Sequence, residues 1–202
     1  MKISDKMFGN LRITWIRIIL SGILCGAYTG IIMTIPALKN TSFQDIGIGF
    51  EWWILFAMLI IANSKSPKES ACKTFAFFLI SQPIVFLIQP NGMDLFHRYY
   101  GGWFIWTLFT FPMAWIGWYT RKNNIPAVLI LSPMLILLID HSLSYVRKQH
   151  ILSAIFCLVE VMILIFAIFK EKKHRILAII ISIAAESILE FIWLFILNSD
   201  LS

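Results

Sequence analysis

The feature of this sequence that most constrains its fold is a series of long apolar runs separated by short charged islands. Hydrophobic residues make up 59% of the 202 residues and charged residues 14%, whereas soluble proteins contain about 45–50% and about 25%. A helix that spans a membrane needs about 20 mostly apolar residues. The islands between the runs are too short for a soluble domain. We therefore predict an all-α transmembrane bundle that forms a single integral membrane domain over residues 1–202.

The apolar runs predict seven membrane-spanning helices with short connections. The second run is the shortest and needs residues 46–49 to reach across a bilayer. A six-span arrangement with both ends inside would follow if the fifth and sixth runs were divided differently. The seven predicted spans cover residues 13–35, 50–63, 71–89, 102–120, 126–145, 149–169 and 176–197.

The distribution of basic residues predicts the orientation of these spans. With a cytosolic N-terminus, thirteen of the 17 lysines and arginines fall in islands on the inner side, and only Lys39, Arg98, Arg147 and Lys148 fall outside. Inner loops of membrane proteins carry this excess of positive charge. The positive net charge is thereby explained without nucleic acid as a partner. We expect a multi-pass protein of the cell membrane, and the abundance of Ile, Phe, Lys and Asn favours a bacterial cytoplasmic membrane.

Three glutamates within the last two runs are the main indication of function. Residues 180–196 read IISIAAESILEFIWLFI and contain Glu186 and Glu190, while Glu160 lies in the run before. Glu160 and Glu186 lie ten and eleven residues from the basic hairpin that joins the two runs, about 15 Å along a helix and near the bilayer centre. A charged residue at that depth costs about 2.5–3.5 kcal/mol, and no lysine or arginine is found at midplane in any run.

These glutamates predict either a ligand site or a structural contact. In the first interpretation they bind a proton or a small cation in a pocket that the third to seventh spans form together. Prolines interrupt three successive runs, and kinked helices of this kind commonly line cavities. We assign Gln82 and Trp106 to the same pocket, as a hydrogen-bonding group and an aromatic wall. In the second interpretation the glutamates are protonated and join helices by hydrogen bonds.

The first run contains a stripe of glycines at Gly22, Gly26 and Gly30. Small residues four apart form one face of a helix and allow another helix to approach closely. The neighbouring helix could belong to this chain or to a membrane partner subunit. In size and in this stripe the chain resembles the substrate-binding subunits of energy-coupling-factor vitamin transporters. That resemblance implies docking through the first helix, but those subunits have six helices with both ends inside, and no family motif runs through this chain.

The remaining chemistry-bearing residues do not indicate an enzyme. Cys25, Cys72 and Cys157 have no zinc-ligand spacing and are interpreted as packing residues. Asp140 and His141 lie near the outer end of the fifth run and are interpreted as an interfacial pair. No hydrolase or phosphate-binding motif is present in the sequence, so an intramembrane enzyme is less favoured, and no cofactor or metal is predicted. We predict binding or transport of a small molecule, cationic or proton-coupled, with a non-catalytic membrane subunit as the alternative.

Overall fold

The computed structural model describes residues 8–9 and 11–199, the last seven of these by their backbone only, and within this part the chain forms helices and no strand. Two short 3₁₀ segments, η1 (Pro36–Leu38) and η2 (Trp118–Lys122), occur in the connections. The helices are α2 (Trp15–Thr34), α3 (Ser42–Ile48), α4 (Phe50–Asn63), α5 (Pro67–Leu87), α6 (Gly92–Gly117), α7 (Ile125–Arg147), α8 (Ile151–Ile168) and α9 (Lys172–Ser199).

Five segments of the described chain are long and apolar enough to cross a membrane. They are α2, the combined α3–α4 segment, α5, α7 and α8. Several such helices in one chain indicate a multi-pass membrane protein. Helices α6 and α9 are longer still, but the first begins with polar residues such as Asp94 and Arg98 and the second with a basic cluster. The count of seven spans therefore stays a prediction.

The second span differs from its predicted boundaries of 50–63. Helix α3 precedes α4, and the Thr41 side chain caps it by accepting a hydrogen bond from Gln44 N. The two helices are separated by Gly49, whose backbone is extended at φ −65° and ψ 163°. A Cβ at Gly49 would collide with the carboxylate of Glu51. The span therefore covers residues 42–63, and Glu51 lies near its middle rather than at its outer end.

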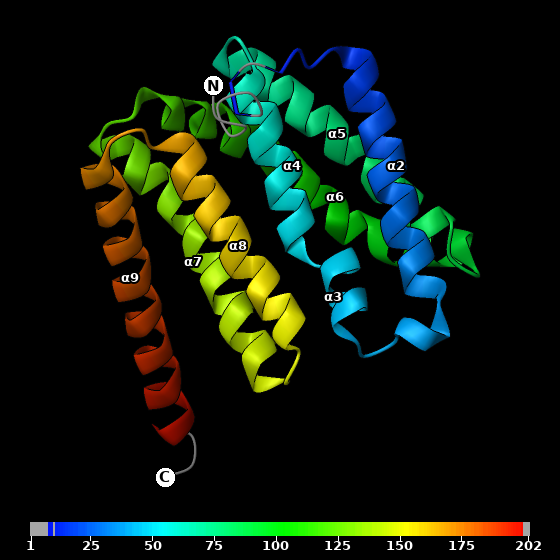
Figure 1. Ribbon diagram of the computed structural model, residues 1–202. Helices are drawn as coiled ribbons and strands as arrows, with labels where there is room; N and C mark the ends of the chain where they lie inside the picture. The colour runs from blue at the N-terminus through cyan, green and yellow to red at the C-terminus, as the bar shows by residue number, and fades with distance from the viewer. Residues whose placement is uncertain (1–7, 10, 200–202) are drawn as a thin grey trace.

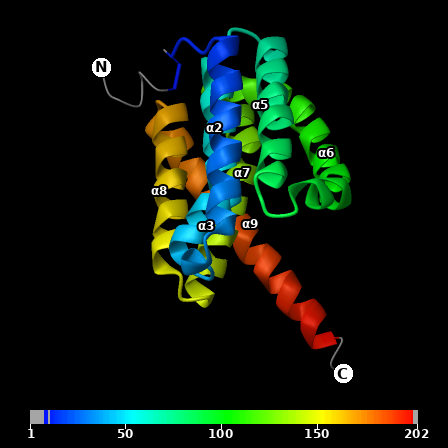
Figure 2. The same ribbon diagram turned by 90° about the vertical axis from the view of Figure 1, so that its right-hand side faces the viewer.

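Helix α4 lies between two groups of helices (Figure 1). One of its faces packs through Met58 and Ile61 into a core shared with α7 and α8. The opposite face packs through Trp53 and Ile60 against α2 and α5. Helix α9 runs along α7 and makes little contact with α8, and its C-terminal half diverges from the bundle (Figure 2). The sequence neighbours α8 and α9 are therefore not a closely packed hairpin.

The loops that carry most of the basic residues are joined at one end of the bundle. Asn63 Oδ1 accepts hydrogen bonds of 2.7 and 2.9 Å from backbone N–H groups of the N-terminal segment. Ser64 O accepts one of 3.0 Å from Trp118 Nε1. Asn123 Oδ1 accepts one of 3.2 Å from the backbone N–H of Lys170. Gathering of these basic loops at one end is what the positive-inside rule requires, although which side of the membrane they face stays a prediction.

The glycine stripe of α2 packs against α5 within the same chain. A Cβ at Gly26 would lie 2.5 Å from Ser81 O, and at Gly22 and Gly30 it would lie 3.2 and 3.0 Å from other backbone oxygens of α5. The glycines therefore allow the two backbones to approach closely, as the packing interpretation expects. While α5 occupies this face, the stripe is not available to a partner subunit.

Candidate functional site

Two glutamates are buried where α4 packs against α8. Glu51, in the first turn of α4, is 1% exposed, and Glu160, at the middle of α8, is 2% exposed. Glu51 lies near Glu160, because Cys157, one turn before Glu160 on α8, donates a hydrogen bond of 3.3 Å to Glu51 Oε1. Both glutamates lie in helices apolar enough to span a membrane. We call them the carboxyl pair.

One oxygen of Glu51 has two side-chain partners. Glu51 Oε1 lies 3.0 Å from His141 Nδ1, on α7, and accepts a hydrogen bond of 3.3 Å from Cys157 Sγ, on α8. Its second oxygen, Oε2, is buried without a hydrogen-bond partner. The contact with His141 joins the carboxyl pair to the third helix of this core, so α4, α7 and α8 all contribute to the cluster.

Glu160 has no partner at either carboxyl oxygen. Both oxygens are buried and neither makes a hydrogen bond. An ionised carboxylate in such an environment carries a large desolvation penalty, and repulsion from a second carboxylate adds to it. The arrangement is therefore stable when the pair holds a proton or when a cation lies between the two groups.

His141 lies between the carboxyl pair and the molecular surface. Its side chain is 24% exposed, compared with 1% for the side chain of Glu51. The ring of Phe50 packs 5.8 Å from the imidazole, and that of Tyr145 packs 6.2 Å away. The imidazole is therefore the more exposed of the two groups, while its Nδ1 contacts the buried carboxyl.

Helix α3 closes the neighbouring end of this cluster by binding to the start of α8. Asp45, on α3, forms an ion pair with His150, which precedes α8. Ser153 Oγ donates hydrogen bonds to Ser42 O at 3.2 Å and to Asp45 Oδ2 at 3.3 Å. These contacts hold α3 in place beside Gly49, where the span is interrupted.

Of the three glutamates predicted from the sequence, the structure places one in the carboxyl pair. Glu186 is buried against α7, where its charged neighbours are Asp140 and Arg147. Glu190 forms an ion pair with Arg147. The sequence predicted no basic residue at midplane, and Arg147 is the last residue of α7; its long side chain nevertheless reaches Glu190 on α9, a pair that the sequence did not predict.

The other two predicted pocket residues lie elsewhere in the bundle. Gln82 is buried on α5, which packs on α2 and α6 rather than on α8. Trp106, on α6, is 68% exposed and packs against Phe109 with ring centroids 6.3 Å apart. The structure does not bring either of them to Glu160.

Sequence reasoning missed Glu51 and His141. An acidic residue at the start of an apolar run normally complements the helix dipole at a membrane boundary. The sequence pattern therefore predicted Glu51 at the end of the span and not near its middle. Recognising Thr41 as a helix cap would have extended the span and moved Glu51 toward its centre. His141 reaches the pair only through the packing of α7 on α4 and α8.

The cluster does not have the geometry of a cysteine nucleophile. Activation of a thiol requires hydrogen bonding to its general base, but both Cys157 and His141 contact Glu51 Oε1, which lies between them. Cys157 is also fully buried. Among the described residues, no group of three or more His, Cys, Asp or Glu side chains is arranged to hold a metal ion.

Comparison of the chain with protein-family models, curated proteins and solved structures finds no match.

Proposed function

We propose that this multi-pass membrane protein binds a proton or a small cation at the carboxyl pair, as a transporter or a membrane-embedded binding protein does. The observation that carries the proposal is that Glu160 is buried at mid-helix with neither oxygen hydrogen-bonded, next to the buried Glu51. Ionisable residues within membrane spans commonly belong to proton relays and ion pathways.

The energetics favour an occupant at the pair. Each charged carboxylate at the centre of a span costs about 2.5–3.5 kcal/mol, and two together also repel each other. One proton or one monovalent cation removes half of that charge. The remaining charge on Glu51 is stabilised by the hydrogen bonds from His141 and Cys157.

His141 is the group through which the pair would exchange protons. It is the more exposed partner in its 3.0 Å contact with Glu51. A proton received by the imidazole from the surface can pass from Nδ1 to Glu51 Oε1, and Glu51 can then pass a proton to Glu160 when Glu160 is ionised.

The interrupted span beside the pair also supports the proposal. Discontinuous helices in transporters line substrate and ion sites near the bilayer centre, and α3 and α4 are discontinuous at Gly49, two residues before Glu51. The alternative of a docking subunit depended on the glycine stripe of α2, which α5 occupies in this chain.

The test is carbodiimide labelling in membrane vesicles, read out by mass spectrometry. Hydrophobic carbodiimides react with protonated carboxyls in apolar surroundings. We expect labelling at Glu160 that falls as the pH rises, and a bound cation should protect it. Glu69 is a matched internal control, because its 2.5 Å ion pair with Lys73 keeps it ionised, and it should not react.

Thermal shifts with a panel of cations test binding itself. Glu160→Gln keeps the side-chain shape and removes the charge, so the protein should fold while its affinity for the cation falls at least tenfold, or about 1.4 kcal/mol. Glu190→Gln is the control, because Glu190 pairs with Arg147 outside the site. Labelling that does not change with pH, together with equal cation responses in both variants, would show that Glu160 has no part in binding a proton or a cation.

A further inference from the structure

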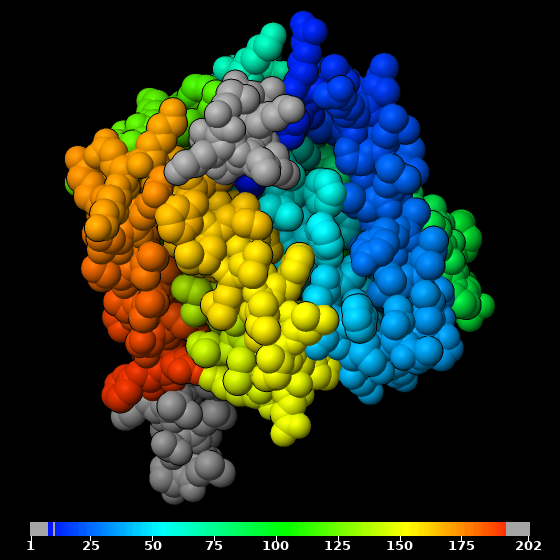
Figure 3. Space-filling model, viewed as in Figure 1, coloured from blue at the N-terminus to red at the C-terminus, as the bar shows by residue number. Residues whose placement is uncertain are grey.

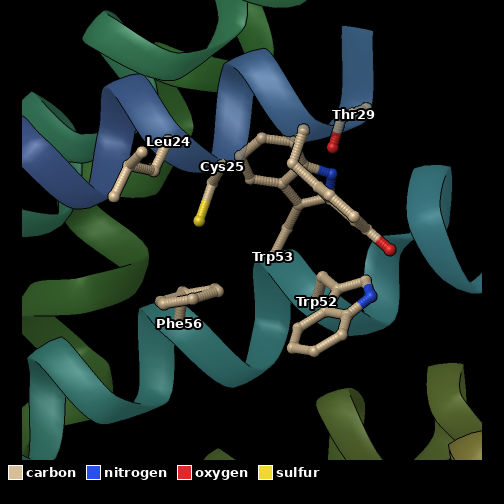
Figure 4. A pocket seen from close by; sticks show the side chains of 7 residues that line it. Leu24, Cys25, Thr29, Trp52, Trp53 and Phe56 are labelled. Atoms are coloured by element: carbon tan, nitrogen blue, oxygen red, sulfur yellow. The ribbon is translucent and has the colours of Figure 1, made fainter. Parts of the chain in front are cut away.

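A groove of about 420 Å³ lies between α2 and α4. Its volume falls within the range of about 300–1,000 Å³ that is typical of ligand pockets. Figure 4 shows the aromatic rings of α4 facing the side chains of α2 across the opening. The groove is lined by Tyr28, Trp52, Trp53 and Phe56, with Leu24, Cys25 and Thr29.

The lining of the groove carries no charge. Thr29, whose hydroxyl is one of the few polar groups in it, donates its Oγ1 hydrogen to Gly47 O at 3.1 Å. The carboxyl of Glu51 is turned the other way, toward α7 and α8. A charged ligand would find no counter-charge in this groove and would lose its hydration there. The occupant is therefore apolar where it contacts the protein.

The groove lies near the middle of two segments that are long and apolar enough to cross a membrane. Residues 24–29 are central in α2, and residues 52–56 are central in the span of residues 42–63. Leu24, at the rim, is 68% exposed, so the groove opens to the surface that lipid covers. In the face shown in Figure 3, α4 is visible between α2 and α8. Molecules dissolved in the bilayer reach this opening directly, and water-soluble ligands do not.

We propose that this groove binds one acyl chain of a membrane phospholipid. Helices α2 and α4 run side by side along the bundle (Figure 1), so a groove between them follows the direction in which lipid chains lie. The aromatic walls supply a large contact area for methylene groups. The site is separate from the carboxyl pair, because the Trp52 ring packs against Phe156 of α8 and stands between the groove and the cluster.

The test blocks the groove with a substitution at its rim and measures how much phospholipid stays bound to the purified protein. Leu24→Trp places a large ring over the opening, and because Leu24 is 68% exposed the change should not disturb folding. Leu20→Trp is the matched control, on the same helix, 53% exposed and outside the groove. In native mass spectrometry of protein purified from phosphatidylcholine vesicles, we expect one phospholipid on the wild type and on Leu20→Trp, and at least tenfold less on Leu24→Trp.

A second measurement keeps the proposal testable if Leu24→Trp purifies poorly. Phosphatidylcholine brominated at mid-chain quenches tryptophan on contact. At a low fraction of brominated lipid, we expect a larger fraction of the tryptophan fluorescence to be quenched in the wild type than in Trp52→Phe. The difference should exceed what the removal of one average tryptophan would cause. Glu160→Gln should retain the phospholipid, so failure of the carboxyl-pair proposal leaves this one intact. Equal lipid retention by Leu24→Trp and Leu20→Trp would overturn the lipid-binding proposal. Quenching that only follows the fraction of brominated lipid in the bilayer would overturn it as well.

Discussion

Replacing Gly26 by alanine should destabilise the protein, although alanine is the better helix former. The added Cβ would lie 2.5 Å from Ser81 O, 3.1 Å from Ser81 Cα and 3.0 Å from Ile84 Cβ. Two of these atoms belong to the backbone of α5, which cannot rotate away as a side chain can. The helices must therefore separate along their shared face.

The size of the effect follows from two opposing contributions. Overpacking of a tight contact costs typically about 1–3 kcal/mol, and a contact with backbone belongs in the upper part of that range. The alanine side chain returns up to about 1 kcal/mol through helix propensity. We expect Gly26→Ala to lose roughly 1–2 kcal/mol of unfolding free energy, the difference between these two terms.

Gly102→Ala is the matched control. Gly102 is also within a helix, α6, but a Cβ there would have no neighbouring atom within 4 Å. It should therefore gain about 0.5–1 kcal/mol from propensity alone. Thermal unfolding of both variants in the same detergent, followed by tryptophan fluorescence, should separate their midpoints by several degrees, since about 1 kcal/mol shifts Tm by about 2–4 °C in a chain of this length. Equal midpoints for the two variants would refute close packing of α2 on α5.

Two further predictions concern the interrupted span and the topology. Gly49→Ala should displace the Glu51 carboxylate, with which its Cβ collides. We therefore expect a cation to protect Glu160 less well from carbodiimide labelling in this variant than in the wild type. Unchanged protection of Glu160 would show that Glu51 is not part of the site. For topology, a membrane-impermeant thiol reagent applied to intact cells should label Gln149→Cys and not Asn123→Cys, in a chain whose Cys25 and Cys72 are replaced by alanine. The opposite labelling pattern would reverse the orientation inferred from the basic islands.

The approximate position of the helices was predictable because the signals for a membrane span are local. Apolar runs of sufficient length predict helices wherever backbone groups must bond within their own segment. The basic islands predicted which loops share an end, and bonds such as that from Trp118 to Ser64 O join those loops in the structure. The glycine pattern on α2 likewise predicted a close helix contact, although it did not identify α5 as the partner.

The candidate site depended on which helix faces meet, and this is a tertiary property. Glu160 and Glu186 are neighbours in a diagram of the sequence, but α9 packs on α7, so Glu186 is buried near Asp140 and Arg147, while Glu160 lies on α8 near Glu51. Glu51 and Glu160 are more than a hundred residues apart in the chain. In hydrocarbon almost any apolar face is compatible with lipid, so hydropathy alone does not distinguish a face that packs from one that is free. The sequence by itself determined that carboxyls lie within apolar runs long enough to span a membrane, and only the packing of α4, α7 and α8 decided which two are buried together.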